Sequence, residues 1–362
     1  MDLTLLVTTL LLVIFGVVMV YSASAVFAGH RYGNPQYFLF RQVLYAVIGL
    51  VGLGFFARMD YQLLRRLTYP MLAVTVGLLV AVVAGFGHGA GGATRWLRLG
   101  PLRLQPAELA KVTLVLWLAH SLSKKGHKIR TFGIGFMPHA VMALAIMALC
   151  LRQPDFGSAV VVGLLTFTML FVAGARTGYI LGALGLILPV AVSLVRGAEY
   201  RMRRWMAFQN PWEHRHGIAY QLVESLISFG AGGTTGVGLG DSRQKLFFLP
   251  EAHTDFIGAI VGEELGFLGV CALLGAYCVV AWRGVRIALR AADDYGTYVA
   301  FGITTLLSLQ VLINLGVAMG KLPTKGLTLP FVSFGGSSLA VDLVAVGILL
   351  SISRGASAEE DG

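Results

Sequence analysis

The sequence predicts an all-α polytopic membrane protein with about ten transmembrane helices and one large outer loop between the seventh and eighth helices. Its 362 residues are 56% hydrophobic and only 13% charged, and the mean hydropathy is +0.76, which is far from the composition of soluble globular chains. Ten apolar runs lie near 3–28, 42–56, 67–85, 107–122, 136–151, 156–173, 179–195, 256–282, 298–319 and 330–351. Because about 20 helical residues cross a bilayer, these runs predict a single integral membrane domain over residues 1–362.

The first apolar run starts directly after Met1 and Asp2, without a basic segment before it. Small residues at 21–25 resemble a signal-peptide cleavage site, but the later runs are also apolar, so we expect an uncleaved first helix. The cysteines, Cys150, Cys271 and Cys278, fall inside apolar runs without a partner at metal-ligand spacing. They are therefore expected to be packing residues.

The distribution of basic residues predicts the orientation of the chain. Twelve lie in the loops after even-numbered runs or at the C-terminal end: Arg58, Arg65, Arg66, Lys124, Lys125, Lys128, Arg130, Arg176, Arg283, Arg286, Arg290 and Arg354. By the positive-inside rule these residues place both termini in the cytoplasm. The other sixteen lie on or near the opposite side. Such a surplus of outer cations indicates an anionic ligand, for example lipid phosphates, with contact to outer-leaflet lipid as the alternative.

Two outer segments are longer than simple connections. Residues 85–105 contain Arg95 and Trp96 and lead into a helix whose first turn holds Pro106. Residues 196–254 form the large extracytoplasmic loop, which begins with a basic and aromatic stretch expected to be an interfacial helix or arm. The glycine runs of both segments lack Walker spacing and a preceding strand, which disfavours a soluble nucleotide site.

The third outer segment, residues 320–338, is dense in Pro, Gly, Ser and Lys just before the last helix. Since unpaired backbone amides are not tolerated against lipid, this composition predicts broken backbone that lines a cavity.

Charged residues inside apolar runs are costly unless they are paired or face water. Glu108 and Lys111 are three residues apart on one helical face, so they are expected either to form a structural ion pair or to point Lys111 toward an outer cavity. Asp155 follows a tight turn and suits a helix cap as well as a binding role. Glu263 and Glu264 are expected to link helices.

Several long motifs occur in order along the chain. They are residues 217–221, GVGLGDSRQK, FLPEAHTDFI, the Glu263–Glu264 pair and PTKGLTLPFVSFGGSS. Together they resemble the SEDS family of peptidoglycan glycosyltransferases over nearly the whole chain. The PTKG context of Lys325 is more similar to the cell-division (FtsW-like) branch than to the elongation (RodA-like) branch. The chain departs from the family pattern at Gln153, where many members have glutamate, and at Phe334, where tyrosine is common.

This resemblance implies polymerisation of lipid II at the outer face of the cytoplasmic membrane, with the growing glycan strand as donor. Inverting transfer needs a carboxylate base and cations for the departing pyrophosphate, and Asp255 matches the family's essential aspartate. The expected substrate-binding residues are Arg95, Trp96, Glu108, Lys111, Asp155, Gln221, Arg243, Lys245, His253, Lys325 and Ser333.

The resemblance also implies partners, namely a single-pass class B penicillin-binding transpeptidase and other membrane proteins of the division septum. Membrane lipid is expected around the chain, and nucleic acid is not. No cofactor is evident, and no ligand cluster supports a divalent cation.

Two other function classes fit the same residues. A lipid II flippase would use the cavity and its cations without a base, and a structural division subunit would depend on helix surfaces instead.

Overall fold

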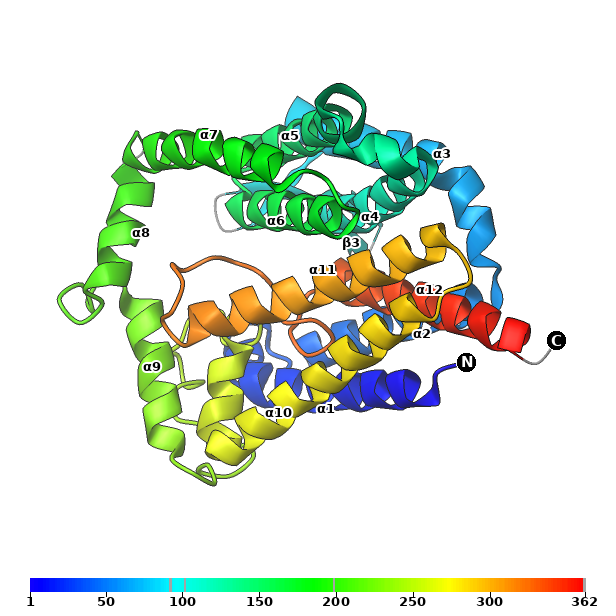
Figure 1. The fold of residues 1–362 in the computed structure, drawn as a ribbon. Coiled ribbons are helices and arrows are strands. Elements are labelled where there is room, and N and C mark those ends of the chain that lie inside the picture. Colours follow the sequence, from blue (N-terminus) through cyan, green and yellow to red (C-terminus); the bar gives the residue numbers. More distant parts are fainter. Residues whose placement is uncertain (91–92, 101, 198, 361–362) are drawn as a thin grey trace.

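A computed structural model describes residues 1–90, 93–100, 102–197 and 199–360. Each of the ten predicted apolar runs is a helix (Figure 1). They are α1 (Leu3–Tyr32), α2 (Tyr37–Arg58), α3 (Tyr61–Ala81), α4 (Pro106–Lys125), α5 (Met137–Arg152), α6 (Phe156–Val172), α7 (Thr177–Arg196), α10 (Ile257–Leu289), α11 (Asp294–Ala318) and α12 (Ser337–Glu360). The predicted all-α membrane fold is confirmed, although the last helix begins at Ser337 and not near residue 330.

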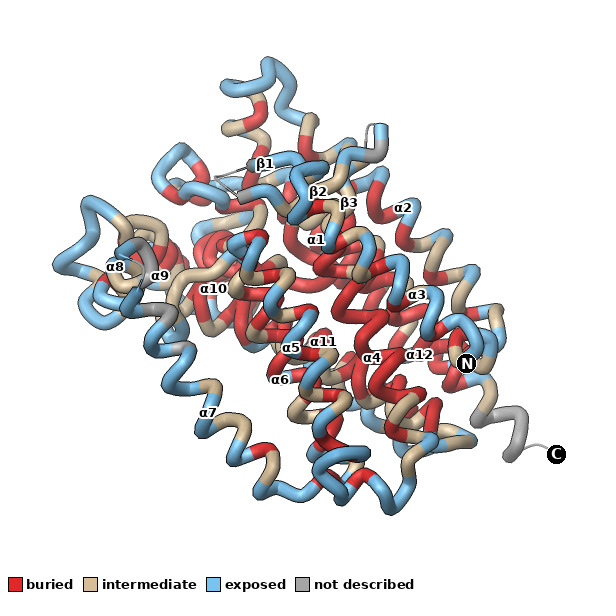
Figure 2. Tube along the Cα trace, turned by 90° about the horizontal axis from the view of Figure 1, so that it is seen from above, coloured by how far each residue is buried: buried red, intermediate tan, exposed pale blue. Residues whose placement is uncertain are grey.

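Within the described residues, seven of these helices are long and apolar enough to cross a membrane on their own. The exceptions are α4, which is more polar, and α6 and α7, whose fully described apolar stretches are shorter. Helix α4 is buried along almost its whole length and packs against α3, α6 and α11, as Figure 2 shows. A central helix contacts protein instead of lipid, so it can carry charged side chains that a lipid-facing helix cannot.

The outer segments contain regular structure that the sequence pattern did not predict. Strands β1 (His88–Ala90), β2 (Ala93–Leu99) and β3 (Leu102–Leu104) form an antiparallel sheet in the order β1-β2-β3. The large loop contains α8 (Glu199–Gln209), where a helix or arm was expected, and also α9 (Tyr220–Gly232).

The two described termini lie at the same end of the helix bundle (Figure 1). The backbone N–H of Asp2 donates to the Ser353 hydroxyl at 3.1 Å, and the Asp2 carboxylate pairs with Arg283 at 2.6 Å. At the other end of α1, Phe27 stacks on His253 with ring centres 5.9 Å apart. The segment that carries His253 therefore lies at the end of the bundle opposite to the termini.

Helix α10 is interrupted at Gly266, where φ is 66° and ψ is −165°. The freed backbone groups pair with the glycine-rich segment 233–238. Val237 N–H donates to the Glu263 carbonyl at 3.0 Å, and Phe267 N–H donates to the Gly233 carbonyl at 2.9 Å. These bonds satisfy backbone groups that a broken membrane helix would otherwise leave unpaired. A Cβ at residue 266 would overlap the backbone of Thr234 and Gly236.

We expect Gly266→Ala to destabilise the protein by about 1–3 kcal/mol, because a left-handed conformation without glycine is strained and the added methyl meets backbone. The measurement is the thermal unfolding midpoint in detergent. Gly275→Ala is the matched control, since it lies in the same helix and its Cβ would meet nothing within 4 Å. Equal midpoints for the two variants would contradict this account of the break.

Candidate active site

Asp255 lies in an irregular segment two residues before α10 begins at Ile257. The segment is held on two sides. The His253 carbonyl accepts the Phe334 N–H at 2.9 Å, and the Asp255 carbonyl accepts the Asn314 Nδ2–H at 2.9 Å. The backbone at Asp255 is therefore tied to the segment before α12 and to α11.

The Asp255 carboxyl group has an electrostatic environment unlike that of a surface aspartate. Burial and the nearby Glu251 carboxylate raise the pKa of Asp255 to about 7, against the opposing effect of the Arg95 and Arg204 guanidinium groups. A carboxyl group with a pKa near neutral pH is suited to accept a proton during a reaction and release it afterwards.

The PTKG segment between α11 and α12 approaches this carboxylate closely. A Cβ added at Gly326 would lie 2.9 Å from Asp255 Oδ2, so any larger residue there would displace the carboxylate. The neighbouring Lys325 places its ammonium group 4.0 Å from the centre of the Phe156 ring. Burial lowers the pKa of Lys325 to about 8. The segment that approaches the candidate base at Gly326 thus also carries a partly desolvated cation, Lys325.

Two arginines border the same region. Arg95, on β2, donates to the Gln153 carbonyl at 3.2 Å and also bonds the Pro154 carbonyl, which ties the sheet to the turn between α5 and α6. Arg204, on α8, donates to the Thr324 carbonyl at 3.5 Å. The structure therefore brings β2, α8 and the PTKG segment together around Asp255. Trp96, next to Arg95 on β2, is half-buried.

Asp155 caps α6, as the alternative interpretation of the sequence expected. Its carboxylate accepts the Ser158 N–H at 3.1 Å and the Gln105 Nε2–H at 3.3 Å. The Asp155 carboxylate also lies close enough to raise the pKa of Asp255. Its capping role therefore does not remove it from the region of the candidate base, and its contact with substrate stays a prediction.

Glu108 and Lys111 form the expected ion pair, with 2.7 Å between Oε2 and Nζ. Both side chains are almost completely buried on α4, and Gln310 of α11 adds a 3.5 Å hydrogen bond to Glu108. The pair joins α4 to α11 in the interior of the bundle. Contact of either residue with substrate stays a prediction.

The paired glutamates of α10 contact Lys245 and the backbone of Arg243. Lys245 forms a buried ion pair of 3.1 Å with Glu264, which also accepts the Ser22 hydroxyl hydrogen at 2.6 Å. Glu263 accepts the Arg243 backbone N–H at 2.9 Å, while the Arg243 side chain is exposed. The glutamates thus link α10 to α1 and to the large loop. Contact of Lys245 or Arg243 with substrate stays a prediction.

The remaining predicted residues have different surroundings. His253 is buried among aromatic rings, with the Phe38 ring centre 4.3 Å away, and burial lowers the pKa of His253 to about 4, which keeps the imidazole neutral. Ser333 is buried and accepts the Leu329 N–H at 2.9 Å, so its hydroxyl closes the turn before α12. Gln221 is half-buried in the first turn of α9.

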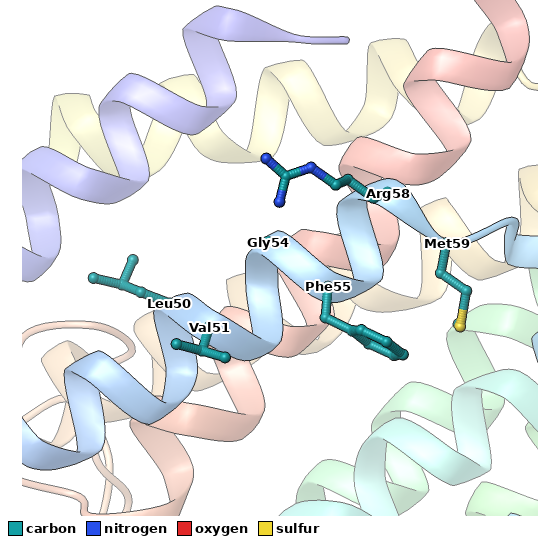
Figure 3. Close-up of a pocket in the computed structure, with 6 residues that line it drawn as sticks. All are labelled: Leu50, Val51, Gly54, Phe55, Arg58 and Met59. Carbon is teal, nitrogen blue, oxygen red and sulfur yellow. The ribbon is translucent and has the colours of Figure 1, made fainter.

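Two surface hollows of the described structure lie apart from these residues. One, of about 640 Å³, follows α2 and is lined by Leu50, Val51, Gly54, Phe55, Arg58 and Met59 (Figure 3). The other, of about 300 Å³, lies beside α8 and is lined by residues between 203 and 218. Neither has Asp255 or Lys325 in its lining. Among the described residues, no group of three or more His, Cys, Asp or Glu side chains is arranged to hold a metal ion.

A model of the cell cycle proteins FtsW, RodA and SpoVE matches residues 2–358. The chain belongs to the FtsW/RodA/SpoVE family. The predicted SEDS resemblance is confirmed. The chain is 48% identical to a probable peptidoglycan glycosyltransferase FtsW of Geobacter metallireducens, over 97% of this chain and 94% of that protein.

Two solved structures also resemble this family member over 98% of its chain, each at 30% sequence identity. One is described as "Structural coordination of polymerization and crosslinking by a peptidoglycan synthase complex", with a TM-score of 0.82 and 98% of that chain covered. The other is the rod shape determining protein RodA of Thermus thermophilus, with a TM-score of 0.71 and 96% covered. The multi-pass membrane architecture is therefore that of the family.

Several residues around Asp255 were not among the predicted site residues of this family member. Arg204 appeared in the sequence only as one of many outer cations, and Gly326 and Phe156 carried no separate signal. Asn314 lies inside an apolar run and looks like an ordinary packing position. The sequence offered a clue only for Arg204, through its charge. The other residues gave none, because the contacts that bring them together join distant segments of the chain.

Proposed function

We propose that this FtsW/RodA/SpoVE-family protein is a peptidoglycan glycosyltransferase that polymerises lipid II into glycan strands at the outer face of the cytoplasmic membrane. One observation carries the proposal. The carboxyl group of Asp255, whose pKa is about 7, lies against Gly326 of the PTKG segment. The pKa of Lys325 in that segment is lowered, and the charges of Arg95 and Arg204 act on Asp255. The names of the relatives, which include a probable peptidoglycan glycosyltransferase, support the same activity.

The proposed reaction is an inverting displacement at the anomeric carbon of the donor sugar. The acceptor 4-hydroxyl oxygen forms the new bond to that carbon as the bond to the pyrophosphate oxygen breaks. Asp255 takes the hydroxyl proton, and the bonding electrons leave with the pyrophosphate. The cations of Lys325, Arg95 and Arg204 stabilise the negative charge that develops on the leaving group.

We further propose that the protein works in cell division, with both termini in the cytoplasm and a single-pass class B transpeptidase as partner. The FtsW names of the relatives and the likeness to a chain of a peptidoglycan synthase complex support this assignment. The contact between Asp2 and Ser353 supports a common side for both ends, and the basic loops near them support the cytoplasmic side. One hydrophobic core that includes residues from Leu5 to Ile352 supports a single functional domain.

The test is to purify the chain with its cognate transpeptidase, supply lipid II, and separate the products by gel electrophoresis. Glycan strands from the native protein support the proposal. Transbilayer movement of lipid II in vesicles, without any polymer, would support a flippase. If the protein shows neither polymerisation nor transbilayer movement, a structural role is the interpretation that is left.

Polymerisation by the native protein is expected to have a bell-shaped pH dependence between about pH 6 and pH 9. Activity rises with pH through about 7, because the pKa of Asp255 is about 7 and only its ionised form accepts a proton. Activity falls above about 8, because the pKa of Lys325 is about 8 and its cation is then lost. The measurement is the initial rate of polymerisation across this range.

Glu251→Gln provides a further check on the acidic limb of that profile. Removing this carboxylate removes a charge that raises the pKa of Asp255, so the limb should move to lower pH. A rate that does not change with pH in either protein would contradict the assignment of Asp255 as the base.

A further inference from the structure

One buried side chain of α11 connects the two irregular segments of the proposed active site. The Asn314 residue is 2% exposed. Its Nδ2 donates to the Asp255 carbonyl at 2.9 Å and to the Leu327 carbonyl at 2.6 Å. A carboxamide has two N–H groups on one nitrogen, so a single planar group sets the separation of these two carbonyls.

The orientation of this carboxamide is defined by its surroundings. Asn314 Oδ1 is buried and accepts no hydrogen bond from the described residues. A flipped amide would place that oxygen against two carbonyl oxygens, which is repulsive. The observed orientation, with both hydrogens donated, is the one that the two loops require.

Both segments depend on such outside support because neither is part of a regular helix. The first contains Glu251 at a φ of 57°, with a short turn to Thr254. The second has a close turn from Lys325 to Leu327, and Leu327 packs against α6 near Gly157. Between the two Asn314 bonds, Gly326 lies against the Asp255 carboxylate. A change in the separation of the loops would therefore move Asp255 relative to Lys325.

We propose that Asn314 is a positioning residue that holds Asp255 and the Lys325 segment at the separation needed for glycosyl transfer. The inference rests on the function proposed above. Asn314 acts through backbone carbonyls and has no required contact with substrate, so its loss should affect the chemical step more than binding.

The test compares Asn314→Leu, which keeps the branching at Cγ but donates no hydrogen bond, with Asn314→Ser, which is too short to reach both carbonyls. In each variant kcat should fall by about 10- to 100-fold, while KM for lipid II changes by less than about 3-fold. The control is Thr304→Val, a buried polar position of the same helix whose hydroxyl donates to the Ala300 carbonyl within that helix. This control should keep kcat within about 2-fold of the parent.

A double variant separates positioning from general damage. If Asn314 acts through Asp255, Asn314→Leu combined with Asp255→Asn should be no slower than Asp255→Asn alone. If the kcat losses of the two single substitutions multiply in the double variant, the inference is wrong. It is also wrong if Asn314→Leu and Asn314→Ser both keep the kcat of the parent. Full activity of Asp255→Asn by itself would instead overturn the base assignment in the proposed function, so the two failures are distinguishable.

Discussion

Asp255→Asn is expected to lower the rate of glycan-strand formation by about 10²- to 10⁴-fold, the usual range for loss of a general base. Asparagine has nearly the same shape as aspartate but cannot take the acceptor proton. The backbone carbonyl that Asn314 holds is unchanged by the substitution, so the local fold should survive. The measurement is the polymerisation rate of the purified complex with the transpeptidase, at saturating lipid II.

The control for this substitution is Asp241→Asn, which removes an exposed carboxylate from the large loop. It should retain nearly full activity. Partner binding and thermal stability of Asp255→Asn must match those of the parent. Equal amounts of polymer from Asp255→Asn and the parent would remove Asp255 from the chemistry and leave the enzyme without its proposed base.

Lys325→Gln is expected to produce the second large loss, about 10²-fold in kcat, which is typical when one group that stabilises developing charge is removed. The Lys325 side chain is half-buried, and its ammonium lies over the Phe156 ring. The ion pairs found among the described residues do not include Lys325. In the proposed reaction this charge would stabilise the pyrophosphate leaving group.

Two further measurements test that role. Lys321→Gln removes an exposed lysine from the same connection and should change kcat by less than about 2-fold. In Lys325→Gln the fall in rate above about pH 8 should disappear, because the group that titrates there is gone. A Lys325→Gln enzyme with the parent rate and pH profile would exclude the ammonium from catalysis.

The sequence by itself determined the family, the ten helices and the position of Asp255. Membrane helices must satisfy their backbone bonds internally and need long apolar runs, so each run was visible in the composition alone. The motif around Asp255 was continuous, and the charged pair Glu108 and Lys111 had helical spacing. Local patterns of this kind need no knowledge of which segments meet.

Outer structure was less predictable. Strands β1 to β3 and helix α9 were missed because each is short and lies beside a glycine-rich run, so an apolar pattern extends over too few residues to stand out. The ion pair between Lys245 and Glu264 was not predicted. Contact of Lys245 with substrate stays a prediction. Which cation pairs with which acid depends on how the glycine-rich loop enters the break in α10.

Only the tertiary structure decided how the candidate active site is assembled. Asp255, Arg204, Asn314 and Gly326 belong to four separate elements, and none predicts the others by spacing. The pKa of Asp255 follows from burial and from neighbouring charges on α8 and β2. Such effects depend on distances of a few ångströms between chain-distant groups, since electrostatic and hydrogen-bond energies fall steeply with separation. The sequence therefore identified the candidate base, and the packing of α8, α11 and the two loops determined its environment.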